Sequence, residues 1–265
     1  VAMIFEKPST RTRVSFEIAV YELGGYPMYL SANDIQLSRG ETVHDTAKVL
    51  SRYVQGMTLR TFSHKNVIEL ATNSDVPVIN ALSDYEHPCQ ILADLLTIKE
   101  KKGLNGIKVS FIGDGDNNVT NSLIFGCSIL GIGLAISSPK EYQPKEEVLK
   151  TAKKLNKNSK ITVISDPKEA VKNADVIYTD VWVSMGMEKE KEKRIKAFKD
   201  FQLNKNLLKY TGKNDYIVMH CLPAHRGEEI TDEVMDGPNS VVFDQAENRL
   251  HAQKAVLYLL IGGDR

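Results

Sequence analysis

Short apolar strand patterns alternate with helical patterns along almost the whole chain, and no other feature of the sequence limits the fold as strongly. The first strand pattern covers 2–5, and Val14, Ile18, Tyr21 and Leu23 then repeat at helical spacing. Further strands are predicted at 26–30, 56–59, 77–81, 107–113, 133–137, 160–164, 176–179, 216–219 and 241–243. Helices are predicted at 42–55, 65–72, 87–102, 145–155 and 168–173, from about 188, and through Leu260. Alternating strands and helices form parallel sheets through right-handed crossovers, so we expect an α/β fold.

The length of the chain favours two domains. With 265 residues it is long enough for two medium-sized hydrophobic cores. The charged run at 99–102 and Gly103 end a predicted helix, and we place the domain boundary there. We therefore expect two domains, 1–102 and 103–246, each a mostly parallel sheet flanked by helices, followed by a C-terminal helix at 247–265.

Composition excludes several classes of partner. The 34 basic and 34 acidic residues balance, so no overall field favours nucleic acid or an anionic membrane. The cysteines, Cys89, Cys127 and Cys221, are few and widely spaced, which is typical of a cytoplasmic protein and gives no zinc-binding pattern. No apolar run reaches the roughly 18 residues that span a bilayer. The chain opens on Val1 inside a strand, so we expect residues to precede it, and a targeting peptide among them stays open.

The join between the first strand and the first helix carries hydroxyls and cations. Ser9-Thr10-Arg11-Thr12-Arg13 lies at the predicted helix start. Free amide groups and the positive end of the helix dipole favour an anion there, and an arginine fork binds two phosphate oxygens at once. The sequence therefore predicts a phosphate-binding loop. The structural alternative is that Ser9 is only an N-cap and that the two arginines lie on a solvated face.

Two other segments follow predicted strands of the same half. Arg60 ends the strand at 56–59, while His87 and Gln90 begin the helix after the strand at 77–81. Ligands of parallel sheets collect at the carboxyl ends of the strands, so we expect these residues to lie near Ser9–Arg13. A histidine at a helix start is more often a cap or a surface residue, and that alternative is retained.

A glycine-rich turn follows the strand at 107–113. Gly113-Asp114-Gly115 suggests a dinucleotide-binding loop, but Asn118 stands where the third glycine of that fingerprint belongs. No acidic residue closes the next strand, at 133–137, so we reject a nicotinamide cofactor. The Asn118 amide both donates and accepts hydrogen bonds, which suits contact with a small molecule.

The second half places a carboxylate and a thiol directly after strands. Asp180 follows the strand at 176–179, and Cys221 follows the strand at 216–219 with His220. Between them, 181–186 breaks all periodicity, and we expect Trp182 to be exposed there. This segment is either a lid beside Gly186 or an ordinary surface loop.

Four motifs in this order resemble the aspartate/ornithine carbamoyltransferase family, and within it the enzymes that act on ornithine. They are Ser9–Arg13, His87-Pro88-Cys89-Gln90, Asp180 with Ser184-Met185-Gly186, and His220-Cys221-Leu222-Pro223. The resemblance covers essentially the whole chain. It implies a first domain for carbamoyl phosphate, a second for the amino acid, and a final helix that returns to the first domain. It further implies transfer of the carbamoyl group to the side-chain amine of L-ornithine, giving L-citrulline and phosphate, with no metal and no cofactor.

The resemblance also implies roles for individual residues. The catalytic set would be Arg60, His87, Asp180 and Cys221. The residues implied for carbamoyl phosphate are Ser9, Thr10, Arg11, Thr12, Gln36, Arg60, His87, Gln90, Cys221, Leu222 and Arg249. Those implied for ornithine are Asn118, Asp180, Ser184 and Met185. Gln36 matches a loop position that reaches a neighbouring subunit's site, which implies a homotrimer or a multiple of trimers.

Three alternatives stay open at this point. An aspartate carbamoyltransferase shares the first-domain motifs, but it would bind a dicarboxylate with additional cations, whereas Asp180 is an anion. A putrescine carbamoyltransferase would have a different motif at 184–186. A non-catalytic sensor of a phosphorylated metabolite would keep the fold without turnover. The direction of the reaction, toward arginine biosynthesis or in reverse, is not determined by the sequence.

Overall fold

The computed structural model describes residues 1–184, 186 and 188–262, and the chain divides into two compact units. The first unit is Val1–Ala93 with Glu247–Arg265, and the second is Asp94–Ala246. The division falls inside helix α4 (Pro88–Lys102), earlier than the boundary expected after residue 102. The C-terminal helix α11 (Val242–Leu257) begins in the second unit and ends in the first.

The first unit is built on a four-stranded parallel sheet of order β2-β1-β3-β4. Its strands are β1 (Ala2–Phe5), β2 (Met28–Ser31), β3 (Met57–Arg60) and β4 (Val78–Leu82). Its helices, besides the parts of α4 and α11, are α1 (Thr10–Glu22), α2 (Val43–Leu50) and α3 (His64–Asn73). The register sets Arg60 beside Phe5, so the loops after β1 and β3 leave the sheet at the same edge.

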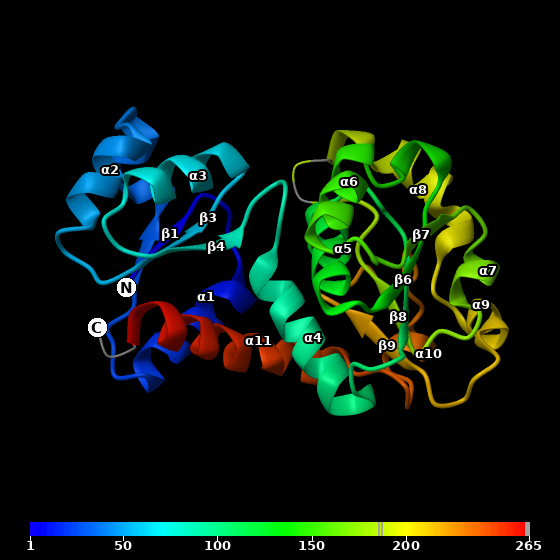
Figure 1. Cartoon of the computed structure of the whole chain (residues 1–265). Helices are drawn as coiled ribbons and strands as arrows, with labels where there is room; N and C mark the ends of the chain where they lie inside the picture. Colours follow the sequence, from blue (N-terminus) through cyan, green and yellow to red (C-terminus); the bar gives the residue numbers. More distant parts are fainter. Residues whose placement is uncertain (185, 187, 263–265) are drawn as a thin grey trace. The chain divides into compact units, whose positions relative to one another are not determined.

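Both faces of this sheet are covered by helices, as the unbroken apolar strands require. Along β1, Ala2 and Ile4 pack into a core with α2 and α3, while Met3 and Phe5 pack into a second core with α1 and α11. Figure 1 shows α2 and α3 over one face and α1 and α11 over the other. The α/β prediction for this half is confirmed.

Helix α1 is present as predicted, but it buries a different face. The residues whose spacing predicted the helix, Val14, Ile18 and Tyr21, are 50%, 40% and 72% exposed. Phe16 and Ala19 pack into the core instead. Both stripes have helical spacing, so periodicity identified the helix without identifying its buried side.

The second unit holds a five-stranded parallel sheet of order β7-β6-β5-β8-β9. Its strands are β5 (Lys108–Ile112), β6 (Gly133–Ser137), β7 (Ile161–Ile164), β8 (Val176–Thr179) and β9 (Ile217–His220). Its helices are α5 (Asn118–Leu130), α6 (Glu146–Leu155), α7 (Pro167–Val171), α8 (Lys191–Phe198), α9 (Lys205–Leu208) and α10 (Asp232–Met235). The chain goes from β5 to β6 on one side and later returns to β8 on the other. Ligands of open parallel sheets bind where the strand order reverses in this way, so the carboxyl ends of β5 and β8 are the expected place.

The predicted strand at 241–243 is wrong. Val241 donates one hydrogen bond to the Val218 carbonyl at 3.0 Å, and the chain then enters α11 at Val242. Within the described residues, the only strand-like pairing here is an isolated bridge between Ser240 and Val218 of the edge strand β9. Among the described residues, no helix combines the length and the apolar character needed to cross a bilayer.

Candidate active site

The loop after β1 ends in a capped helix start. The Ser9 hydroxyl accepts a hydrogen bond from the Thr12 amide at 3.3 Å, so Ser9 is an N-cap, as the structural alternative predicted. Thr10 is the exposed first residue of α1, and Arg11 is half-buried. The remaining amides of this first turn lie at the carboxyl edge of the sheet, where helix geometry favours an anion.

Buried arginines gather around this helix start. Arg60 is 8% exposed at the end of β3, and Arg249 is 3% exposed on α11. Burial, and then the neighbouring charges of Arg249 and Arg11, lower the pKa of Arg60 to about 10. The Arg60 Nε is buried and has no hydrogen-bond partner among the described residues. Like charges held together with an unused donor are the arrangement that a bound anion stabilises.

Arg249 ties three helices of the first unit together. Its Nη1 donates to the Gln90 Oε1 at 2.7 Å, and its Nη2 donates to the Thr12 hydroxyl at 3.2 Å. His87 is buried beside these groups, and burial, followed by the charges of Arg249 and Arg60, lowers its pKa well below the ordinary value. His87 is therefore neutral at pH 7, and it acts as a hydrogen-bonding group rather than a cation.

One predicted residue lies apart from this cluster, and one member of it was missed. Gln36 is exposed in the short turn Gln36–Arg39, and no hydrogen bond joins it to the cluster within the described residues. Lys7, which sequence reasoning did not select, is 8% exposed, and its Nζ lies 4.1 Å from the centre of the Phe62 ring. Burial and then Arg60 lower the pKa of Lys7. Its place in the loop after β1 was the signal that could have identified it.

In the second unit, Asp180 and Cys221 form a hydrogen-bonded pair. Asp180 follows β8 and is 7% exposed, and its Oδ1 accepts from the Cys221 Sγ at 3.0 Å and from the Val181 amide at 2.8 Å. Burial raises the pKa of the Asp180 carboxyl. Burial and then Asp180 raise the pKa of the Cys221 thiol well above its ordinary value, so the thiol keeps its proton and donates it. The Asp180 Oδ2 receives no hydrogen bond from the described residues.

His220 fixes the turn that carries Cys221. Its Nδ1 accepts from the Leu222 amide at 2.9 Å, so its proton is on Nε2, which donates to the Glu229 Oε1 at 3.0 Å. Leu222 has a left-handed backbone, with φ of 59°. Asp180, His220 and Cys221 offer oxygen, nitrogen and sulfur within 4.8 Å of one another. Both ring nitrogens of His220 are already used, so the three residues are organised by hydrogen bonds rather than as metal ligands.

A buried ion pair connects the two loops predicted for ornithine. Arg194 on α8 pairs with Asp114 after β5, and its Nε donates to the Trp182 carbonyl at 2.6 Å. Asn117 caps α5, accepting from the Thr120 amide at 2.8 Å, and thereby sets the half-buried Asn118 as the first residue of that helix.

The expected exposure of Trp182 is wrong. Trp182 is 3% exposed, and its ring stacks on Phe198 at 6.0 Å between centres, so it anchors the segment after Asp180 to the core. Ser184 is half-buried, and Met185 lies outside the described residues.

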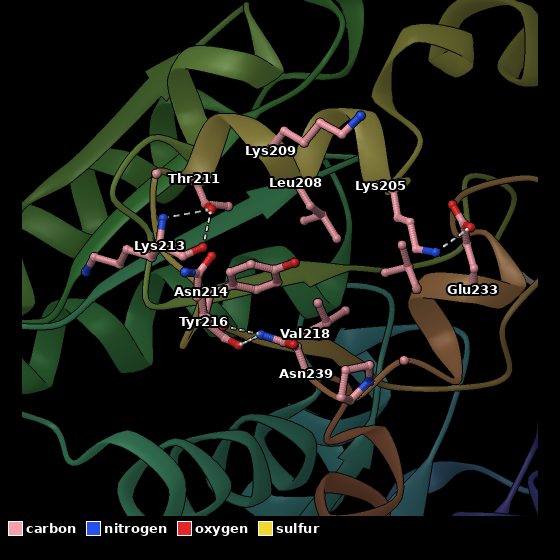
Figure 2. A pocket seen from close by; sticks show the side chains of 14 residues that line it. Lys205, Leu208, Lys209, Thr211, Lys213, Asn214, Tyr216, Val218, Glu233 and Asn239 are labelled. Carbon is pink, nitrogen blue, oxygen red and sulfur yellow. Dashed lines mark hydrogen bonds and ion pairs between the residues drawn. The ribbon is translucent and has the colours of Figure 1, made fainter.

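A cavity of about 600 Å³ lies elsewhere in the second unit. Figure 2 shows it around Tyr216 and Leu208, with the Asn239 amide donating to the Tyr216 carbonyl at 2.6 Å. Tyr216 precedes β9, so the cavity is at the amino end of that strand, whereas Cys221 follows its carboxyl end. The cavity is therefore separate from the Asp180–Cys221 pair.

Comparisons with known proteins agree over the whole chain. Residues 1–100 match the carbamoyl-P binding domain of aspartate/ornithine carbamoyltransferase, and residues 105–260 match its Asp/Orn binding domain. The chain is 58% identical to the ornithine carbamoyltransferase of Thermococcus kodakarensis, over 99% of this chain and 84% of that protein. It is 55% identical to the catabolic ornithine carbamoyltransferase of Thermoplasma acidophilum, over 98% of this chain and 86% of that protein. The solved structure of ornithine carbamoyltransferase from Pyrococcus furiosus superposes with a TM-score of 0.95 at 58% identity, covering 100% of this chain and 85% of that one.

Proposed function

This chain belongs to the aspartate/ornithine carbamoyltransferase family, and we propose that it transfers the carbamoyl group of carbamoyl phosphate to the side-chain amine of L-ornithine. The products are L-citrulline and phosphate. The observation that carries the choice of an amine substrate is Asp180, a buried carboxylate whose Oδ2 is open among the described residues. An aspartate substrate would bring further carboxylates to this anion, which the charge of Asp180 disfavours.

The first unit supplies the phosphate side of the reaction. Ser9, Thr10 and Thr12 offer hydroxyl and amide donors, while Arg11, Arg60 and Arg249 offer guanidinium forks to the phosphate oxygens. Neutral His87 donates to the carbamoyl oxygen, where negative charge grows in the transition state. Gln90 is positioned by Arg249 and completes this side.

The second unit supplies the amine side. The side-chain amine of ornithine has a pKa near ~10, so it arrives as an ammonium and must lose a proton before it attacks. Asp180 binds this ammonium, Cys221 orients Asp180, and Asn118, Ser184 and Met185 contact the amino-acid part. Asp180 takes the ammonium's first proton. The nitrogen–carbon bond then forms as the carbon–oxygen bond to phosphate breaks, and the leaving phosphate accepts the second proton from the attacking nitrogen. No covalent enzyme intermediate is needed.

Two substitutions test this division of labour. Arg11→Ala removes phosphate-side binding, so phosphate no longer raises the melting temperature of the protein. Asp180→Asn keeps the phosphate-dependent rise but loses ornithine affinity, because a charge-assisted hydrogen bond worth about 1.5–3 kcal/mol is gone. That loss corresponds to about a 10- to 100-fold higher KM for ornithine. Equal loss of both properties in each variant would contradict the assignment.

Assembly, location and pathway complete the proposal. We place the enzyme in the cytoplasm as a homotrimer or a multiple of trimers, in which Gln36 reaches a neighbouring subunit's site. Its exposure in the turn Gln36–Arg39 supports this role. Arginine biosynthesis is the proposed direction. The relative from Pyrococcus furiosus is named anabolic and that from Thermoplasma acidophilum catabolic, so citrulline formation and phosphorolysis should be measured side by side.

A further inference from the structure

Three buried side chains of the second unit, carried by three different elements, are each hydrogen-bonded to the other two. Asp94 on α4, Tyr178 on β8 and Gln245 on α11 are each 0% exposed. The Tyr178 hydroxyl donates to the Asp94 Oδ2 at 2.9 Å. The Gln245 Nε2 donates to the Asp94 Oδ1 at 2.7 Å and to the Tyr178 hydroxyl oxygen at 3.1 Å. We call these three residues the Asp94 cluster.

The Asp94 cluster contacts the turn that carries Cys221 at two points. The Tyr178 hydroxyl faces the Cys221 thiol closely enough to affect its pKa, while its own proton is donated to Asp94 and the thiol's proton to Asp180. The Gln245 Oε1 accepts from the His220 amide at 2.9 Å, which replaces the partner that an edge strand lacks at its end. The residue before the thiol is therefore held by a hydrogen bond from this cluster, and the thiol itself faces the Tyr178 hydroxyl.

The donors and acceptors of the Asp94 cluster require a carboxylate at its centre. Tyr178 and Gln245 both donate to Asp94, so its two oxygens must both accept. An amide at this position would turn an NH₂ group toward one of these donors. Negative charge has a further effect: burial, then Asp180, and then more weakly Asp94, raise the pKa of the Cys221 thiol. Cys221 thus stays protonated and able to donate to Asp180.

We propose that Asp94, acting through Tyr178 and Gln245, is a positioning residue that holds the Cys221 thiol on Asp180 and so aims the Asp180 carboxylate at the amine substrate. This inference rests on the proposed function of the Asp180–Cys221 pair. Asp94 touches neither substrate. Asp94 is the first residue of the second unit, and it lies on α4, the helix whose first turn carries Gln90. The competing explanation is that the cluster only stabilises the second unit.

A double-mutant cycle separates the two explanations. Asp94→Asn and Tyr178→Phe each raise the KM for ornithine about tenfold and leave the KM for carbamoyl phosphate within about twofold. Because Asp94 and Tyr178 belong to one hydrogen-bonded cluster, the double variant raises the KM for ornithine by less than the product of the two single effects, whereas independent effects would multiply. Asp175→Asn is the matched control, since Asp175 pairs with Lys213 before β8 and lies outside the cluster. This control lowers stability without changing either KM.

The pH profile of Cys221 alkylation by iodoacetamide, followed by peptide mass spectrometry, gives a readout that does not depend on activity. The charged or titratable groups facing Cys221 are Asp180, Tyr178, Asp94 and the neighbouring His220 ring. Asp94→Asn removes a negative charge, so the half-point of the profile moves to lower pH, and in a Tyr178→Phe background the same change moves it less. The proposal would be overturned if the folded single variants kept the wild-type KM for ornithine and an unchanged alkylation profile. It would also be overturned if the effects of the two substitutions on this KM multiplied in the double variant. If the wild type forms no citrulline, the proposed function fails, and the alkylation profile still decides the positioning role.

Discussion

Arg60 shows at the scale of one residue why the first unit needs an anion. Its guanidinium is buried beside Arg249 and Arg11, and its Nε has no hydrogen-bond partner in the described chain. A buried cation next to other cations costs free energy of folding until an anion pairs with it. Bound phosphate would relieve this unfavourable free energy, and that relief contributes to its binding affinity.

Arg60→Met should therefore have opposite effects with and without phosphate. Without phosphate, the variant melts at a higher temperature than the wild type because the repulsion among the arginines is smaller. With phosphate at about 100 times its Kd, the wild type gains about 2.7 kcal/mol and the variant gains much less. Differential scanning fluorimetry measures both. Arg13→Met is the control, because Arg13 is exposed and pairs with Glu17. A full phosphate-dependent gain in Arg60→Met would argue against this role.

At the scale of elements, helix starts place the amine-side residues. Asn117 caps α5, and its Nδ2 also donates to the Asp114 carbonyl at 3.0 Å, so one side chain joins the loop after β5 to the helix that begins with Asn118. Asn117→Ala should cost about 1 kcal/mol of stability and also raise the KM for ornithine. Asn204→Ala is the matched control, because Asn204 caps the remote helix α9 in the same way. Urea unfolding and steady-state kinetics check both variants, and an unchanged KM in Asn117→Ala would contradict the placement.

The elements also show what sequence could predict and what it could not. Strand and helix positions follow from local periodicity, so both sheets were anticipated. Burial depends on partners distant in sequence: Val14 and Ile18 are exposed, and Trp182, expected in an exposed loop, packs against Phe198. Val241 resembles the start of a strand locally, but it makes one backbone hydrogen bond to β9 and the chain enters α11 at the next residue.

Individual site residues were predictable only where a motif carries them. Ser9, Arg11 and His87 lie in loops or helix starts that follow strands, and Asp180 follows β8 directly, so topology places each at the carboxyl edge of its own sheet. The Asp94 cluster left no such signal, because Gln245 and Asp94 are 151 positions apart and Tyr178 and Asp94 are 84 apart. Neither residue type nor spacing distinguishes them from ordinary core and helix positions.

At the scale of the whole molecule, the proposed trimer makes a specific prediction. If Gln36 serves a neighbouring subunit, each active site receives Arg11 from one chain and Gln36 from another. Gln36→Ala and Arg11→Ala then damage parts of the site that come from different chains. Each variant alone should have little activity. When the two are denatured, mixed and refolded, some sites in the hybrid trimers receive both native residues, and activity should reappear. Sedimentation must give a mass of three chains or a multiple, and a monomer, or hybrids with no recovered activity, would refute the assembly.

The proposed reaction joins a carbamoyl group to the side-chain amine of ornithine. Its most direct test is steady-state kinetics of the purified protein with carbamoyl phosphate and, side by side, ornithine, putrescine and aspartate, with the carbamoylated product quantified. We predict citrulline formation with a kcat/KM for ornithine about 100-fold or more above that for putrescine or aspartate. Preference for putrescine or aspartate, or binding of ornithine without any turnover, would contradict it.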